Sequence, residues 1–75
     1  MLNKGTRVRV NIPESETTVS RAVRQFSGRV TRITDVKHTY LKKTASLYTY
    51  TLAGCVSDFG IPYEFMEAWL VPQDF

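Results

Sequence analysis

Cysteine and histidine are almost absent from this chain, which has one residue of each, Cys55 and His38. A single cysteine excludes an internal disulfide, and the two residues are too few for a four-ligand metal site of cysteine and histidine. His38 has no nucleophile within a recognisable motif near it in the sequence, as a hydrolytic triad would need. We therefore predict no metal and no cofactor, and we expect Cys55 to be a small buried side chain.

Nucleotide-binding and acid–base motifs are also missing. The four glycines are too widely spaced for a phosphate-binding loop or a dinucleotide fingerprint. Glu64 and Glu67 are three residues apart, but carboxylates at the start of a helical turn usually interact with its N-terminal dipole. The sequence therefore predicts that the protein is not an enzyme.

Long hydrophobic runs are lacking as well. No stretch approaches the roughly 18 apolar residues of a membrane-spanning helix, and residues 1–4 lead into no apolar region of a signal peptide. Together with the lone cysteine, which fits a reducing compartment, this predicts a soluble, cytoplasmic protein with no membrane partner.

Positive charge is absent from the second half of the chain. All ten basic residues lie within residues 1–43, which also hold three acidic residues, so this part carries a net charge of +7. Residues 44–75 contain four acidic residues and no basic one, a net charge of −4. Such an uneven distribution suggests a charged partner or self-association.

What remains is enough for one small globular domain. The chain has 75 residues, of which 43% are apolar and 12% aromatic. These values argue against disorder and predict a single domain over residues 1–75 with a thin core.

Alternating patterns predict mostly strands. Residues 6–12 alternate strictly, with Val8 and Val10 on one face and Arg7 and Arg9 on the other. Residues 13–25 are polar and predict a long loop, within which residues 17–25 have the spacing for a helical turn. Residues 26–40 and 46–53 predict a long hairpin, with a bulge near residues 31–32 that brings Val30 and Ile33 to the same face.

The last third predicts two short strands around one turn. Residues 61–65 predict a strand, and residues 70–71 a final strand that ends at Pro72. Phe65 and Trp69 are four residues apart, the spacing of one helical or 3₁₀ turn that points both rings inward.

Four segments together resemble the SH3-like small β-barrels, in the broad sense that includes KOW and Tudor-type domains. They are Gly5-Thr6-Arg7-Val8-Arg9-Val10, Phe26-Ser27-Gly28-Arg29-Val30, Tyr50-Thr51-Leu52-Ala53-Gly54 and Phe65-Met66-Glu67-Ala68-Trp69-Leu70-Val71-Pro72. The resemblance covers about two-thirds of the chain. It implies an all-β fold: an SH3-like barrel of about five short strands, with a long central hairpin and one helical or 3₁₀ turn before the last strand. It implies no function, because such barrels have many unrelated ones.

The basic residues suggest a non-catalytic binding module that contacts DNA, RNA or a nucleic-acid-associated complex. Cations would contact phosphates, and an exposed aromatic ring would stack on unpaired bases. The candidate residues are Arg29, Arg32, Lys42 and Lys43, with Arg7 and Arg9 secondary and Tyr40 as the stacking residue.

The alternative is a protein-interaction or self-assembly module of a small bacterial or mobile-element protein. It would bind an acidic protein surface, or form a homodimer through the edges of the hairpin near Tyr40 and Leu41. One contiguous face of cations would favour nucleic acid. Cations dispersed among Glu64, Glu67 and Asp74 would favour the protein partner.

Overall fold

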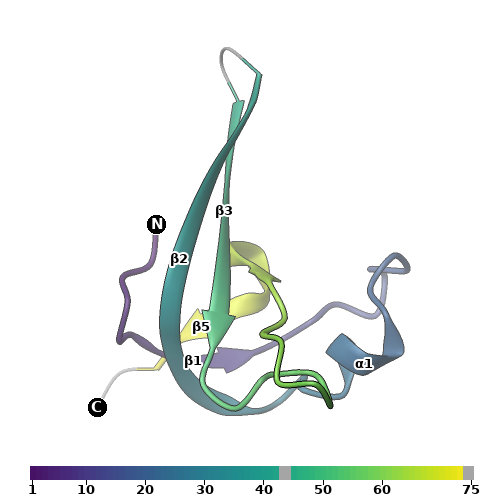
Figure 1. Cartoon of the computed structure of the whole chain (residues 1–75). Coiled ribbons are helices and arrows are strands. Elements are labelled where there is room, and N and C mark those ends of the chain that lie inside the picture. Colours follow the sequence, from purple (N-terminus) through teal and green to yellow (C-terminus); the bar gives the residue numbers. More distant parts are fainter. Residues whose placement is uncertain (43–44, 74–75) are drawn as a thin grey trace.

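Five antiparallel strands and two short helical turns make up the computed structural model, which describes residues 1–42 and 45–73, without the side chains of residues 41–46. The elements are β1 (Arg7–Val10), α1 (Arg21–Arg24), β2 (Val30–Lys42), β3 (Ala45–Leu52), β4 (Phe65–Met66), the 3₁₀ turn η1 (Glu67–Trp69) and β5 (Leu70–Pro72) (Figure 1). The predicted all-β class, the long central hairpin and the turn before the last strand are confirmed.

The strands form one sheet in the order β4-β3-β2-β1-β5. The long strand β2 belongs to both halves of the sheet, because its first residues pair with β1 and the remainder pairs with β3. Figure 1 shows β2 curving from the base of the molecule up into the hairpin. β4 and β5 are the two ends of this order, and no pairing between them is found in the described part of the chain, so closure into a barrel is not shown.

The bulge in β2 lies further along the strand than the sequence predicts. The register with β3 shifts between Ile33 and Asp35, so the extra residue is Thr34 rather than residues 31–32. Residues 30–32 pair regularly with β1, so the bulge lies in the part of β2 that pairs with β3. Val30 is therefore 36% exposed on the outer face while Ile33 is buried, and the prediction that both reach the core is wrong.

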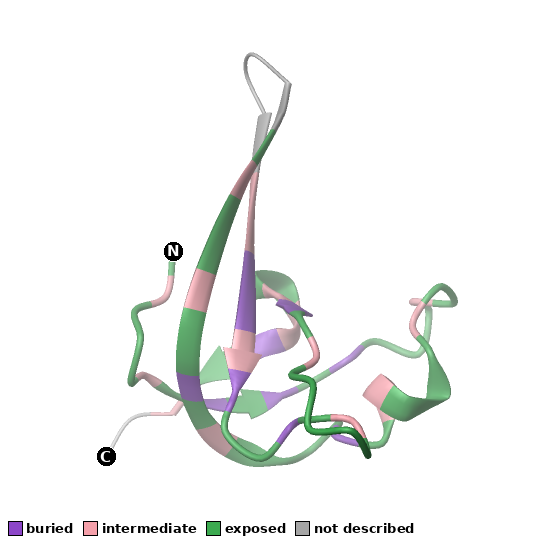
Figure 2. Cartoon of the chain, in the orientation of Figure 1, coloured by how far each residue is buried: buried purple, intermediate pink, exposed green. Residues whose placement is uncertain are grey.

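The core lies between the two halves of the bent sheet, low in the body of the molecule (Figure 2). The spacing predicts that the rings of Phe65 and Trp69 both point inward. Phe65 is fully buried, whereas Trp69 is only partly buried against the core. The other buried apolar residues are Val8, Val10, Ile12, Phe26, Ile33, Tyr50, Leu52, Cys55 and Leu70.

The long connection between β1 and β2 contains one helical turn, as the spacing in residues 17–25 allows. The Ser20 hydroxyl accepts a hydrogen bond from the Val23 amide at 3.4 Å and begins α1. The Arg24 guanidinium donates to the carbonyls of Pro13 and Glu16, which fastens the loop to the helix.

The predicted strand over residues 61–65 is mostly a loop. Val56 and Pro62 form an isolated bridge, and β4 begins only at Phe65. Pro62 has no amide hydrogen to extend a ladder, and Gly60 has a φ of +79°, which turns the chain sharply just before it.

The buried Tyr50 hydroxyl predicts a loss of stability at alkaline pH. It donates to Glu67 Oε1 at 2.7 Å and accepts from the Leu2 amide at 3.0 Å. Burial, followed by the hydrogen bond to Glu67, raises the pKa of Tyr50 above its ordinary value. The folded state then retains a proton that the unfolded state releases, so the free energy of unfolding falls as the pH rises above about 10.

Urea denaturation of wild type and Tyr50→Phe across the alkaline range measures this effect. The variant should show a shallower fall in stability with pH, because the Tyr50 contribution is gone. Burial also raises the pKa of the Cys55 thiol, so this group contributes to the pH dependence as well. Cys55→Ala removes that contribution and serves as the control. An identical alkaline slope in wild type and Tyr50→Phe would contradict the role given to this hydroxyl.

Candidate functional site

Three arginines lie together on the outer face of the sheet. Along β1, Val8 and Val10 are buried and Arg7 and Arg9 are exposed. Arg7 lies directly opposite Arg32 of β2 in the antiparallel register, and residues directly opposite each other project to the same side. We call Arg7, Arg9 and Arg32 the arginine face.

Two exposed valines complete this face. In the register, Arg9 lies opposite Val30 of β2 on one side and opposite Val71 of β5 on the other, and both valines are exposed. Sequence analysis missed their position because β-branched residues in a strand are ordinarily assigned to the core. The surface is therefore cationic, with an exposed valine on either side of Arg9.

Arg9 and Arg32 of the arginine face are not neutralised by acidic side chains of the described residues. The salt bridge found there joins the amino group of Met1 to Glu67 at 3.6 Å, and no carboxylate pairs with Arg9 or Arg32. Arg32 donates to the carbonyl of Gly5 at 3.1 Å, which fixes its guanidinium beside β1. At least two of the three charges are therefore available to an anionic ligand.

Arg29 lies apart from this face. Its guanidinium carbon is 5.1 Å from the centre of the Phe26 ring, and its Nη1 atom is next to Gly54, where the chain leaves β3. Burial of the neighbouring Cys55 thiol raises its pKa, and the positive charge of Arg29 opposes this effect. The structure thus separates Arg29 from Arg32, although the sequence analysis grouped them.

Tyr40 belongs to an aromatic stack on the projecting hairpin. The rings of His38 and Tyr48 are 4.4 Å apart and nearly parallel at 9°, and the Tyr40 ring is 4.4 Å from His38. Tyr40 is 77% exposed. The stack continues the inner side of the sheet, since His38 and Tyr40 follow Val36 at every second residue, so it faces away from the arginine face.

The two candidate lysines, Lys42 and Lys43, give little structural information. Lys42 is the last residue of β2 and its side chain is not described. Lys43 lies outside the described residues.

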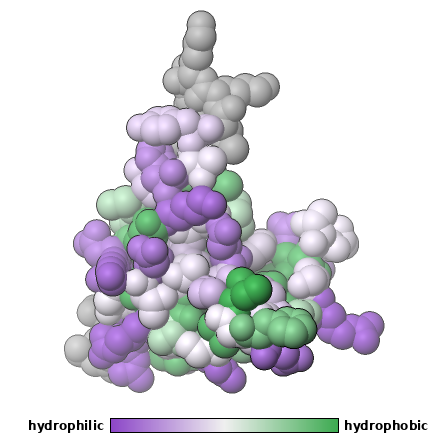
Figure 3. Space-filling model, viewed as in Figure 1, coloured by the Kyte–Doolittle hydropathy of each residue, from purple (hydrophilic) through white to green (hydrophobic). Residues whose placement is uncertain are grey.

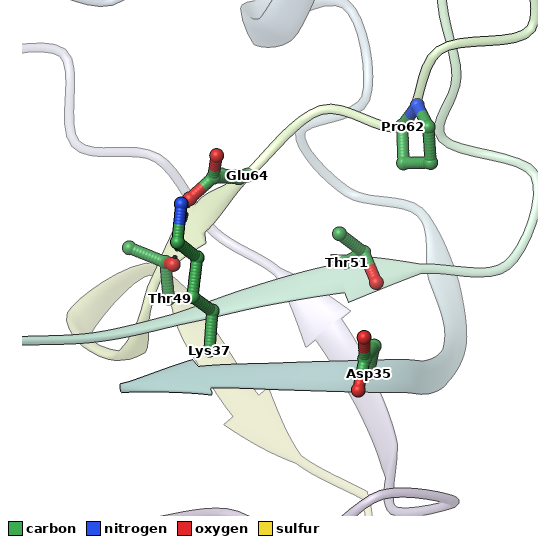
Figure 4. Close-up of a pocket in the computed structure, with 6 residues that line it drawn as sticks. All are labelled: Asp35, Lys37, Thr49, Thr51, Pro62 and Glu64. Atoms are coloured by element: carbon green, nitrogen blue, oxygen red, sulfur yellow. Dashed lines mark hydrogen bonds between the residues drawn. The ribbon is translucent and has the colours of Figure 1, made fainter. Parts of the chain in front are cut away.

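A polar hollow of about 190 Å³ lies on the outer side of the β2–β3 hairpin (Figure 4). Its charged lining residues are Asp35, Lys37 and Glu64, so the hollow carries one more negative than positive charge. The Thr49 hydroxyl donates to Glu64 Oε1 at 2.8 Å. Asp35 follows Arg32 along β2, so a phosphate backbone passing from Arg32 toward Lys42 would meet a carboxylate.

The described residues provide no cluster of three histidine, cysteine or carboxylate side chains that could hold a metal ion. Cys55 is free and buried, and its raised pKa disfavours the reactive thiolate. None of the helices in the described residues has the length and apolar character needed to cross a membrane.

The site is therefore a surface rather than a pocket with catalytic geometry. Its strongest feature is the arginine face. The loop after β3 is a second exposed surface, and the sequence analysis did not predict it. No protein family, curated protein or solved structure matches this chain.

Proposed function

We propose that this chain is a non-catalytic binding module that contacts the phosphate backbone of nucleic acid through the arginine face. The observation that carries the proposal is the register that gathers Arg7, Arg9 and Arg32 on one exposed surface of adjacent strands. The planar guanidinium group presents paired donors that suit phosphate oxygens.

Like charges directly opposite each other on antiparallel strands destabilise a sheet by some tenths of a kcal/mol. Arg7 and Arg32 are such a pair. A ligand that supplies negative charge would offset the repulsion.

We also propose that the fold is an SH3-like barrel and that the protein is cytoplasmic. The strand order β4-β3-β2-β1-β5 and the 3₁₀ turn η1 before β5 support the fold, together with the four sequence segments that resemble such barrels. The cytoplasmic location rests on the single cysteine.

Fluorescence-anisotropy titration of labelled single-stranded and duplex DNA and RNA at low salt tests the function. Phosphate contacts by Arg9 and Arg32 predict a log–log slope of affinity against salt of about −1.8 on duplex DNA and about −1.4 on single strands. The expected dissociation constant is in the micromolar range at low salt, typical of contact without sequence preference. Absence of binding to every DNA and RNA at low salt would overturn the proposal.

Protein interaction stays a second candidate because two other surfaces are unpartnered. In the described residues, β1 pairs with β2 only at residues 30–32, and β4 pairs with β3 only at Thr49 and Tyr50. The outer part of the hairpin therefore has two open edges, which suit strand addition by a partner or a second copy. Dimerisation through these edges stays a prediction. The loop after β3 exposes large apolar side chains, which makes it a better candidate for a contact with another protein.

A further inference from the structure

The loop between β3 and β4 exposes large apolar side chains. Phe59 is 91% exposed and Ile61 is 64% exposed, and Val56 is also exposed. Figure 3 shows an apolar patch low on this side of the molecule, over the region where the loop lies in Figure 1. We call residues 56–61 the apolar loop.

Hydrogen bonds hold the apolar loop in one conformation. The Ser57 amide donates to the Ile61 carbonyl at 2.8 Å, and the Gly60 amide donates to the Ser57 carbonyl at 2.9 Å. The Ser57 hydroxyl accepts from the amides of Phe59 and Ile61, both at 3.2 Å. A fixed loop loses little conformational entropy on binding, so Phe59 is suited to anchor an interface.

The base of the loop is fastened to the core. The Tyr63 amide donates to the carbonyl of the buried Cys55 at 3.1 Å, and the Tyr63 ring lies 6.0 Å from Phe26. These contacts hold the base of the loop against the core while Phe59 stays exposed.

The charge on the loop selects the kind of partner. Asp58 is the charged residue within the loop, beside Phe59, and no cation follows Lys43 in the sequence. Arg29 lies at the base of the loop, near Gly54 and over Phe26. A phosphate backbone would be repelled by Asp58, whereas an apolar protein surface with cations at its rim would fit.

This chain itself has such a surface. The arginine face combines exposed Val30 and Val71 with Arg9 between them in the register. A contact of the loop with the same loop would place Asp58 against Asp58, and a contact of the face with the same face would place arginine against arginine, both unfavourable at close range. A head-to-tail contact instead brings apolar groups together and joins opposite charges.

We infer that the apolar loop of one copy docks on the arginine face of a second copy, with Phe59 and Ile61 against Val30 and Val71 and Asp58 toward Arg9. Each bound copy still has one free loop or one free face, so association continues into longer assemblies unless a ring closes. Nucleic acid and a second copy then compete for the same face.

Mixing two defective variants tests this contact. Phe59→Ala lacks the anchor but keeps the face, and the double variant Arg9→Glu/Arg32→Glu lacks the face but keeps the loop. Sedimentation velocity over micromolar to millimolar protein should show assemblies for wild type and monomers for each variant alone. An equimolar mixture of the variants has one working contact, so it should form dimers and nothing larger.

The expected loss for Phe59→Ala is about 30-fold in the association constant, the effect of removing a typical aromatic anchor. Tyr40→Ala is the matched control, because this ring is also exposed but lies on the hairpin. Circular dichroism and melting temperature should be unchanged in these variants, since the altered side chains are exposed. A monomeric wild type, a mixture that stays monomeric, or assembly lost in Tyr40→Ala but kept in Phe59→Ala would overturn the inference.

Nucleic-acid titrations of the same variants separate this inference from the proposed function. Phe59→Ala should bind nucleic acid as wild type does, and added nucleic acid should dissociate the wild-type assemblies. If the mixed variants form dimers but no nucleic acid binds, the proposed function is overturned and the contact between copies is supported. If nucleic acid binds but the mixed variants stay monomeric, the proposed function is supported and the contact between copies is overturned.

Discussion

Phe65→Ala is expected to lower the free energy of unfolding by about 3–5 kcal/mol, the usual effect of removing a fully buried aromatic ring. Phe65 is completely buried, and its ring packs edge-on against Phe26 with centroids 6.4 Å apart. A domain of this size has a total stability of roughly 4–11 kcal/mol. The variant should therefore be close to unfolding at 25 °C, which urea denaturation followed by circular dichroism would measure.

The matched control is the same change at Phe59, which is 91% exposed. Phe59→Ala should alter the free energy of unfolding by no more than about 0.5 kcal/mol. Trp69→Ala should lie between the two, because Trp69 is partly buried against the core. If Phe65→Ala and Phe59→Ala melt at the same temperature, the packing of β4 and η1 described above is wrong.

The second large effect is expected on nucleic-acid affinity. In Arg9→Gln/Arg32→Gln, the phosphate contacts of both arginines are lost, so the salt slope on duplex DNA should become shallower by about 1.8. At about 20 mM salt the same relation gives a loss of about three decades in the association constant. Anisotropy titrations over a salt series measure both quantities.

Arg21→Gln/Arg29→Gln is the control with the same change in net charge. Arg21 lies on α1 and Arg29 lies over Phe26, so neither belongs to the arginine face. This variant should retain a slope near the wild-type value. An equal loss of affinity in both double variants would mean that net charge alone governs binding and that the arginine face is not the site.

Much of the fold follows from local patterns in the sequence. The alternation of Val8 and Val10 with exposed arginines predicts β1, and the spacing of Phe65 and Trp69 predicts η1. The hairpin follows from two β-rich segments separated by a few residues. Such features depend on neighbouring residues, so they can be inferred without knowing the rest of the chain.

The error in the bulge shows why the site was predicted less well. Arg29 and Arg32 were grouped because both were expected along one long strand, whereas β2 begins at Val30 and Arg29 lies over Phe26. The bulge at Thr34 leaves the start of β2 regular, so Val30 shares the outer face with Arg32 instead of reaching the core. A shift of one residue changes the face of every following side chain, and it depends on pairing with β1 and β3, which local patterns do not determine.

The apolar loop was missed for a related reason. Ile61 precedes Pro62 and Tyr63, and this apolar run predicts a strand that contributes to the core. Whether Phe59 and Ile61 are buried depends on the tertiary position of the loop. Ser57, whose hydroxyl accepts from two amides of the loop, is the one local signal for the turn.

The pairing of β1 with β5 has a consequence for the order of events in folding. It joins Val10 to Leu70, which are 60 residues apart, whereas the β2–β3 hairpin joins residues close in sequence. Pairs so distant in the chain form slowly, because a large loop must close before any contact compensates its entropy. The surface that holds Arg7, Arg9 and Val71 is thus completed late, and a chain emerging during synthesis would have the hairpin well before it could bind through that surface.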